Sequence, residues 1–170
     1  MFQVNDYVVY GKYCVCRVED ICTPPFEVVD NNTKYYVLKP IGIKGNTIYT
    51  PVENNMAVLR SIMTKEEAMD LIHKVPELDT IIVESEKCRE MLYRNSMSKG
   101  DSEELMKLIK TIHFRKEECL ANGKKVSSTD EKYLRLAEES LFGELSCTFG
   151  ISIDEVKNFF IQQVKQLESI

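Results

Sequence analysis

The sequence has no tryptophan and only two histidines among its 170 residues, which limits the chemistry available to it. His73 and His113 lie in helical sequence, and neither has a nucleophile or carboxylate partner at a spacing typical of catalysis, so we expect packing or surface roles. No cluster has the four ligands of a zinc site, and no glycine-rich phosphate loop is found. The sequence therefore predicts no catalytic residues, no metal and no cofactor.

The six cysteines include no C-x-x-C pair and lie in apolar or helical surroundings. We expect reduced, mostly buried thiols, with a disulfide framework as the alternative. One functional hypothesis for these residues is a hydrolase or thiol enzyme built on Cys14, Cys16 or Cys22. No general base lies close to these residues in the sequence, which argues against that hypothesis.

Long hydrophobic runs are also absent. No segment approaches the ~20 apolar residues that a membrane span needs, and strand-like sequence follows Met1 directly in place of a signal segment. We expect a cytoplasmic protein with no membrane partner and no small-molecule substrate. The net charge of −5 argues against general polyanion binding. Between Met106 and Lys125, however, six lysines and arginines face two glutamates, which permits a local basic surface.

The first sixty residues are punctuated like a small antiparallel sheet. Strand-like runs at 8–10, 14–18, 34–38 and 47–50 alternate with turn residues such as Gly11, Pro40 and Pro51. About five short strands in this length predict a small SH3-like or Tudor-like β-barrel, whose closure limits exposed edges.

Beyond Ser61 the hydrophobic period changes from two to 3.6, which indicates helices. Four helix starts are marked by a capping residue three positions before a carboxylate, namely Thr64 with Glu67, Asp101 with Glu104, Ser128 with Glu131 and Ser152 with Glu155. A further helix is predicted over about 83–97. The expected fold class is therefore α+β, with a β-barrel domain over residues 1–62 and an all-α domain of about five helices over 63–170.

Several segments resemble, in order, the CarD/CdnL-type bacterial transcription regulators, whose N-terminal module is shared with the transcription-repair coupling factor. The segments are FQVNDYVVY at 2–10, KYYVL at 34–38, IYTPVEN at 48–54, KGD at 99–101, DEK at 130–132 and LFGEL at 141–145. The resemblance covers nearly the whole chain. It implies a regulator without catalytic activity that binds the β-subunit lobe of RNA polymerase through the β domain. The helical domain would contact promoter DNA and so modulate open-complex stability.

The resemblance also assigns contact residues. In sheet-to-sheet docking, an edge strand supplies affinity through its main chain and selectivity through alternate side chains. The implied polymerase contacts are Lys34, Tyr36, Ile48, Tyr49, Thr50 and Pro51, and a proline at the strand end is expected to stop further pairing. The implied DNA contacts are Arg89, Lys110, Arg115, Lys124, Lys125 and Lys132, through phosphates. The alternatives are barrel-core packing for Tyr36 and a solvated helix face for the basic residues.

Two positions differ from characterised members of that family. Tyr49 stands where they carry an arginine two residues before the proline, and Glu86 lies near the position of a tryptophan wedge found in some members. A carboxylate is repelled by phosphates, whereas an aromatic wedge offsets the unstacking of bases. A second function therefore stays open, that of a protein-protein adaptor whose β domain binds polymerase or another partner and whose helical domain binds protein instead of DNA.

Overall fold

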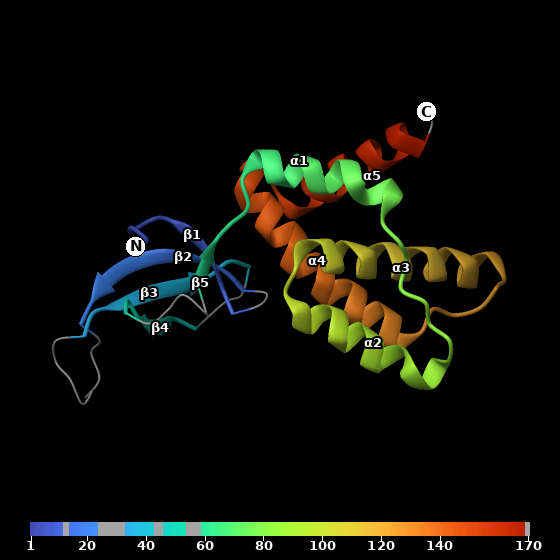
Figure 1. Cartoon of the computed structure of the whole chain (residues 1–170), viewed down its shortest axis with the longest axis horizontal. Coiled ribbons are helices and arrows are strands. Elements are labelled where there is room, and N and C mark those ends of the chain that lie inside the picture. The colour runs from blue at the N-terminus through green and yellow to red at the C-terminus, as the bar shows by residue number, and fades with distance from the viewer. Residues whose placement is uncertain (12–13, 24–32, 43–45, 54–58, 169–170) are drawn as a thin grey trace. The chain divides into compact units, whose positions relative to one another are not determined.

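The structure is a computed structural model that describes residues 1–11, 14–23, 33–42, 46–53 and 59–168, with side chains to residue 162. The chain divides into two compact units, Met1–Ile62 and Met63–Ile170. In the described residues the first unit is an antiparallel sheet of five strands, and the second contains five α-helices and one short 3-10 helix (Figure 1). The predicted α+β class is confirmed.

The sheet has the strand order β4-β3-β2-β1-β5, and all neighbouring strands are antiparallel. Its strands are β1 (Tyr7–Tyr10), β2 (Cys14–Cys22), β3 (Tyr35–Pro40), β4 (Ile48–Pro51) and β5 (Leu59–Ser61). A register shift between Val18 and Asp20 marks a bulge in β2, which bends the strand. Because β3 is its only neighbour in this order, β4 is an edge strand of the sheet.

A hydrophobic cluster of the β unit lies on one face of the sheet, in line with strand alternation, while Val9 and Val15 are buried on the other face. Its buried residues are Val8, Cys16, Val18, Tyr36, Leu38 and Leu59. Phe2 packs its ring edge against Tyr36, with 5.9 Å between the ring centroids. The segment before β1 is therefore part of this unit's packing.

The second unit is built around one central helix, α4 (Ser128–Phe149), which contacts all four other α-helices. The others are α1 (Lys65–Lys74), α2 (Glu86–Lys99), α3 (Ser102–Ala121) and α5 (Ile153–Glu168), and the 3-10 helix is η1 (Val75–Glu77). On α3, Leu105, Leu108, Ile109 and Ile112 recur at helical spacing and are all buried, so they form one core-facing stripe.

Two of the predicted helix starts have the full reciprocal cap. At α1, Glu67 N–H donates to Thr64 Oγ1 and Thr64 N–H donates to the Glu67 carboxylate. Ser152 and Glu155 make the same exchange before α5. The sequence predicts these two capping boxes correctly because both partners of each box lie within one helical turn.

The other two starts differ from the prediction. Asp101 caps α3 through the N–H of the second helical residue, but Glu104 pairs with Lys99 at 2.9 Å and does not complete a box. The cap of α4 is Ser127, one residue before the predicted Ser128. Both serines offer the same hydroxyl, so the sequence alone does not separate them.

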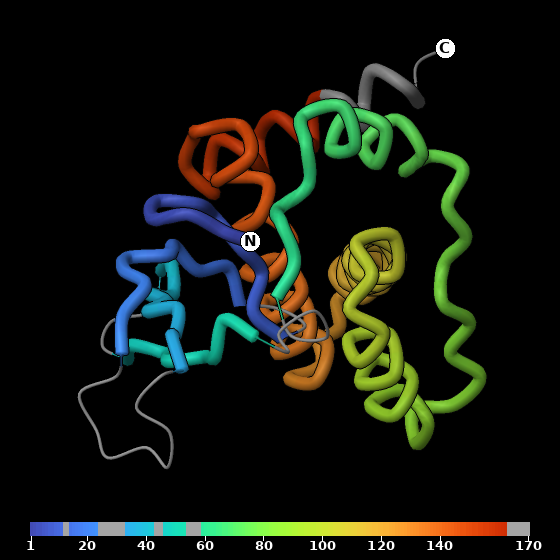
Figure 2. The backbone as a smooth tube through the Cα atoms, turned by 60° about the vertical axis from the view of Figure 1, so that its left-hand side comes forward, coloured from blue at the N-terminus to red at the C-terminus, as the bar shows by residue number. Residues whose placement is uncertain are grey.

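The connection between η1 and α2 is extended and runs along one side of the helical unit, seen as the green tube in Figure 2. Ile81 N–H donates to Thr111 Oγ1 at 2.8 Å, which fixes the segment to α3. The helix predicted from about Val83 begins at Glu86, because this segment is held in extended form.

All six cysteines are free, but only Cys16 is fully buried and the other five are half-buried, so the prediction of mostly buried thiols was wrong. No helix in the described part of the chain is long and apolar enough to cross a membrane. Among the same residues, no group of three or more His, Cys, Asp or Glu is placed to hold a metal ion.

Candidate functional site

The pairing of β4 with β3 determines which main-chain groups of β4 are directed towards β3 and which are directed away from it. Val52 N–H donates to Lys34 O at 2.8 Å, and the register continues with Thr50 opposite Tyr36. Antiparallel pairs alternate between hydrogen-bonded and non-hydrogen-bonded. Ile48 and Thr50 therefore direct their main-chain groups towards β3. The N–H and C=O of Tyr49 are directed to the other side of β4, and Pro51 offers only a C=O there.

The side chains of the predicted polymerase contacts divide between the two faces of the sheet. Tyr36 is only 2% exposed, and its hydroxyl oxygen accepts a hydrogen bond from Phe2 N–H at 3.0 Å. Thr50 is buried, and Ile48 packs against the same core. Tyr36 and Thr50 thus have core roles, in line with the alternative for Tyr36. Tyr49 and Pro51 lie on the opposite face.

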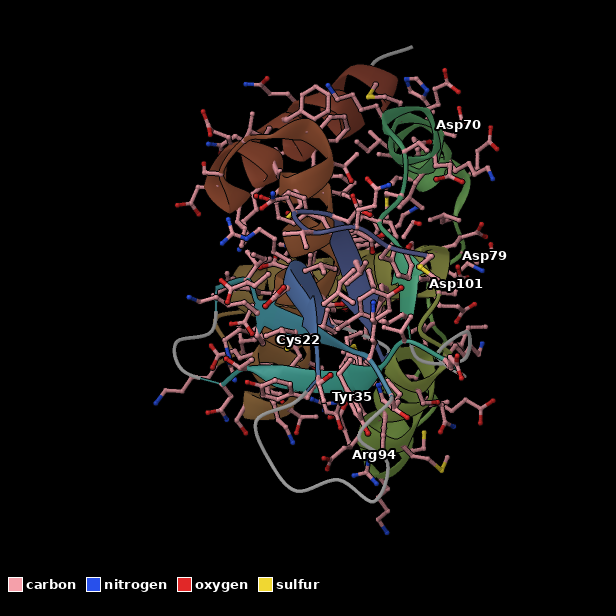
Figure 3. The ribbon with its side chains drawn as sticks, turned by 90° about the vertical axis from the view of Figure 1, so that its left-hand side faces the viewer. Cys22, Tyr35, Asp70, Asp79, Arg94 and Asp101 are labelled. Atoms are coloured by element: carbon pink, nitrogen blue, oxygen red, sulfur yellow. The ribbon has the colours of Figure 1, made fainter. Side chains whose placement is uncertain are left out.

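Two further residues share that opposite face and were not among the predicted contacts. Tyr35 is the register partner of Pro51, and Val37 is the register partner of Tyr49. Both are half-buried. Tyr35 is also paired with Cys22 of β2, and Figure 3 labels both residues. Side chains alternate between the two faces along KYYVL. Once Tyr36 and Leu38 are known to be buried, this alternation predicts that Tyr35 and Val37 lie on the outward face.

Charged residues border this face on β2 and β3. Glu19 Oε1 lies 3.2 Å from Arg17 Nη2 and 3.6 Å from Lys39 Nζ. Arg17 and Lys39 are register partners, so one carboxylate serves two cations across the strand pair. Lys34, at the start of β3, is exposed. The outward face therefore combines aromatic, aliphatic and charged side chains.

In the helical unit, two of the six predicted DNA contacts belong to a buried ionic network. Arg89 is only 8% exposed, pairs with Glu86 and lies with Nη1 3.3 Å from Asp130 Oδ1. Arg115 lies 3.0 Å from Glu86 Oε1 through Nη2 and 3.7 Å from Asp130 Oδ2 through Nε. The network joins α2, α3 and α4, so both arginines have an internal role.

Asp130 is the centre of this network and is 1% exposed. Tyr93 donates its hydroxyl proton to Asp130 Oδ1 at 3.0 Å. Burial, together with the negative charge of Asp130, raises the pKa of Tyr93 and keeps that donor protonated. The Nε atoms of Arg89 and Arg115 are buried without a hydrogen-bond partner among the described residues. Both guanidiniums thus share two carboxylates, the buried one of Asp130 and the exposed one of Glu86.

Lys110 also has an internal role. Its Nζ donates to the carbonyl oxygens of Val75 at 2.8 Å, Pro76 at 3.1 Å and Leu78 at 2.8 Å. The last carbonyls of a helix lack intrahelical partners, and a lysine is a suitable donor to them. Lys110 therefore fixes the end of η1 to α3.

The remaining three predicted DNA contacts are exposed. Lys124 and Lys125 lie in the connection between α3 and α4, and their side chains make no hydrogen bond or ion pair with the described residues. Lys132 lies with Nζ 3.6 Å from Glu90 Oε1 and 5.2 Å from the ring centroid of Tyr133. Of the six predicted DNA contacts, Lys124 and Lys125 are thus the two whose charge is not neutralised by a described residue of the unit.

Comparison with known proteins identifies the β unit. Residues 2–63 match the family of CarD-like/TRCF RID domains. No curated protein matches the chain. The matched range contains all five strands, including β4 with Tyr49 and Pro51. The β unit is therefore similar to the CarD-like/TRCF RID domain, a domain of transcription-related proteins that bind RNA polymerase, and the match does not extend into the helices of the second unit.

Proposed function

We propose that this protein is a non-enzymatic transcription regulator that binds the β-subunit lobe of RNA polymerase through its RID domain. Its helical unit contacts promoter DNA, and the two contacts together modulate open-complex stability. The observation that carries the proposal is the match of residues 2–63 to the RID family. Such a regulator shifts the equilibrium between closed and open promoter by its difference in affinity for the two states.

The strand β4 is the proposed docking edge. It ends the strand order, and its pairing with β3 directs the main-chain groups of Tyr49 away from that strand. A strand of the polymerase lobe would add alongside β4, with main-chain hydrogen bonds supplying affinity. Pairing would stop at Pro51, which has no N–H to donate. Selectivity would come from the outward face, where Tyr49 lies beside Val37.

Two substitutions at one position separate the main-chain contribution from the side-chain contribution. Tyr49→Ala is expected to weaken binding to the isolated β-subunit lobe by about tenfold, because an interface aromatic is lost. Tyr49→Pro also removes an N–H that β4 does not use for pairing with β3. It is expected to abolish binding at micromolar concentration, measured by isothermal titration calorimetry.

The matched control is Tyr7→Ala, which removes an exposed tyrosine from β1. It is expected to leave lobe affinity within about twofold of wild type. Circular dichroism verifies that each variant keeps its fold. If Tyr49→Pro is folded and still binds the lobe with wild-type affinity, docking through β4 is excluded.

The proposed DNA contact lies in the connection between α3 and α4. Lys124 and Lys125 are adjacent and exposed, and the turn before them includes Gly123 with a φ of 66°, a conformation that suits glycine. Ammonium groups placed in this way bind phosphates without reading sequence. Lys132 is the third candidate, although Glu90 already offsets its charge.

The salt dependence of duplex binding tests this contact. Lys124→Glu/Lys125→Glu is expected to reduce the slope of log affinity against log salt by about two, because each lost phosphate contact removes about one. The control is Lys65→Glu/Lys74→Glu, which changes the net charge equally at exposed positions of α1. Equal losses for both variants would show a general charge effect and exclude a specific contact. The measurement is fluorescence anisotropy with labelled promoter DNA.

The adaptor remains the second candidate, and the internal use of Arg89, Lys110 and Arg115 favours it. Three of the six predicted phosphate contacts are bound by the protein itself. Wild-type binding to duplex that stays flat as salt is lowered would identify the helical unit as a protein-binding module. Lobe binding would then persist without any DNA contact.

A further inference from the structure

Two cysteine thiols of the RID domain are in direct contact. Cys14 and Cys16 are two residues apart in β2, so their side chains lie on the same face of the sheet. Their Sγ atoms are 3.6 Å apart, within hydrogen-bonding distance for sulfur. Cys16 Sγ also lies 3.7 Å from the carbonyl oxygen of Cys14. Neither the family match nor the proposed function gives this pair a role.

The two thiols have different surroundings. Cys14 is half-buried, whereas Cys16 is fully buried in the sheet core. The hydrogen bond from the Cys16 thiol, opposed by partial burial, lowers the pKa of Cys14 to about 7. The same contact, burial and the charge on Cys14 raise the pKa of Cys16. Cys14 is therefore the more acidic thiol of the pair, and Cys16 remains protonated near neutral pH.

We propose that Cys14 and Cys16 form an oxidisable dithiol, in which a hydroperoxide attacks at Cys14 and Cys16 then closes an intramolecular disulfide. In the first step the Cys14 thiolate takes one oxygen from the peroxide, whose O–O bond breaks, and leaves a sulfenic acid and hydroxide. In the second step Cys16 sulfur attacks the sulfenic sulfur, and the hydroxyl group leaves as water with the Cys16 proton. Two thiols and one hydrogen peroxide thus give one disulfide and two waters.

The disulfide would change the sheet at this point. Two residues along a strand separate their Cα atoms by about 6.7 Å, at the upper end of the roughly 4.4–6.8 Å that a disulfide spans. Closing the bond therefore shortens β2 where Cys14 pairs with Tyr10 and where Cys16 pairs with Val8 and Pro40. Oxidation is expected to weaken the β1–β2 ladder and so the RID domain.

Cys88 supplies an internal comparison. Hydrogen bonds with Ser85 lower the pKa of this thiol too, but no hydrogen bond joins it to a second thiol within the described part of the chain. Oxidation of Cys88 would thus give a sulfenic acid without an intramolecular disulfide. The dithiol proposal predicts a product that Cys88 does not form.

The test treats the full chain with hydrogen peroxide, blocks residual thiols and maps peptides by mass spectrometry. The peptide containing Cys14 and Cys16 is expected to lose two hydrogen atoms, reversibly with dithiothreitol, in wild type and in Cys88→Ser. Cys14→Ser is expected to give no such product. Cys16→Ser is expected to stop at a sulfenic acid that dimedone traps.

A second measurement does not depend on oxidation. Iodoacetamide labelling of Cys14 is expected to be half-maximal near pH 7 in wild type. Cys16→Ala, which removes the hydrogen-bond donor, is expected to slow labelling at pH 7 by about tenfold, as for an ordinary thiol of pKa about 8.5. Circular dichroism establishes that all three variants are folded. A wild-type Cys14 that labels as an ordinary thiol, or peroxide that oxidises Cys88 and leaves the pair reduced, overturns the proposal. Neither readout involves polymerase, so failure here is distinct from failure of the proposed function.

Discussion

Asp130→Ala is expected to lower the free energy of unfolding of the helical unit by about 3–5 kcal/mol, the range for removing one partner of a buried ionic network. Asp130 lies between Arg89 and Arg115, and it accepts the hydroxyl proton of Tyr93. Without its carboxylate, the buried guanidinium of Arg89 and the half-buried one of Arg115 share only Glu86, which is largely exposed. A buried charge without compensation is costly because the protein interior solvates it poorly.

Urea denaturation followed by far-ultraviolet circular dichroism measures this loss. The control is Glu139→Ala, which removes the carboxylate of the exposed Arg135–Glu139 pair and is expected to cost less than about 1 kcal/mol. Asp130→Asn keeps an acceptor for Tyr93 and is expected to fall between the two. A loss below about 1 kcal/mol for Asp130→Ala would show that the arginines reach water instead. Duplex affinity would then rise, since two cations would be released.

The sequence predicted only in part which side chains of β3 face the core and which face outward. Tyr35 and Tyr36 show why. Alternation requires that one tyrosine of the pair is buried, but the choice depends on the register with neighbouring strands. Here Leu38 is paired with Ile48 over the core, which places Tyr36 inside and Tyr35 outside. Local pattern therefore predicted the strand, and tertiary pairing decided which side chain a partner can reach.

The arginines of the helical unit show a different limit. Arg89 and Asp130 belong to different helices and are separated by forty-one positions, so no spacing rule connects them. A sequence pattern treats an arginine as an available charge, whereas the fold determines whether an internal carboxylate uses it. The exposure of Lys124 and Lys125 could be predicted from the sequence, because a connection between two helices lies at the surface.

Leu38→Ala is expected to weaken binding to the polymerase β-subunit lobe by destabilising the RID domain. Leu38 is completely buried in the hydrophobic cluster of the sheet, and a change of this kind costs about 2–5 kcal/mol. At roughly 0.05–0.15 kcal/mol per residue, a domain of this length has a total stability of only about 3–9 kcal/mol. The substitution therefore removes a large share of it, and apparent lobe affinity falls with the folded fraction.

Hydrogen exchange of the amides in β1–β4 and calorimetric titration with the lobe measure the two halves of this prediction. The matched control is Leu120→Ala on α3, where the leucine is 60% exposed and the expected change in stability is within about 0.5 kcal/mol. Because the helical unit has its own buried stripe, its helical circular dichroism should persist in Leu38→Ala. If the exchange rates rise in β1–β4 while lobe binding is unchanged, the ordered sheet is not what the polymerase recognises. If binding is lost while exchange is unchanged, Leu38 affects the docking edge without unfolding the domain.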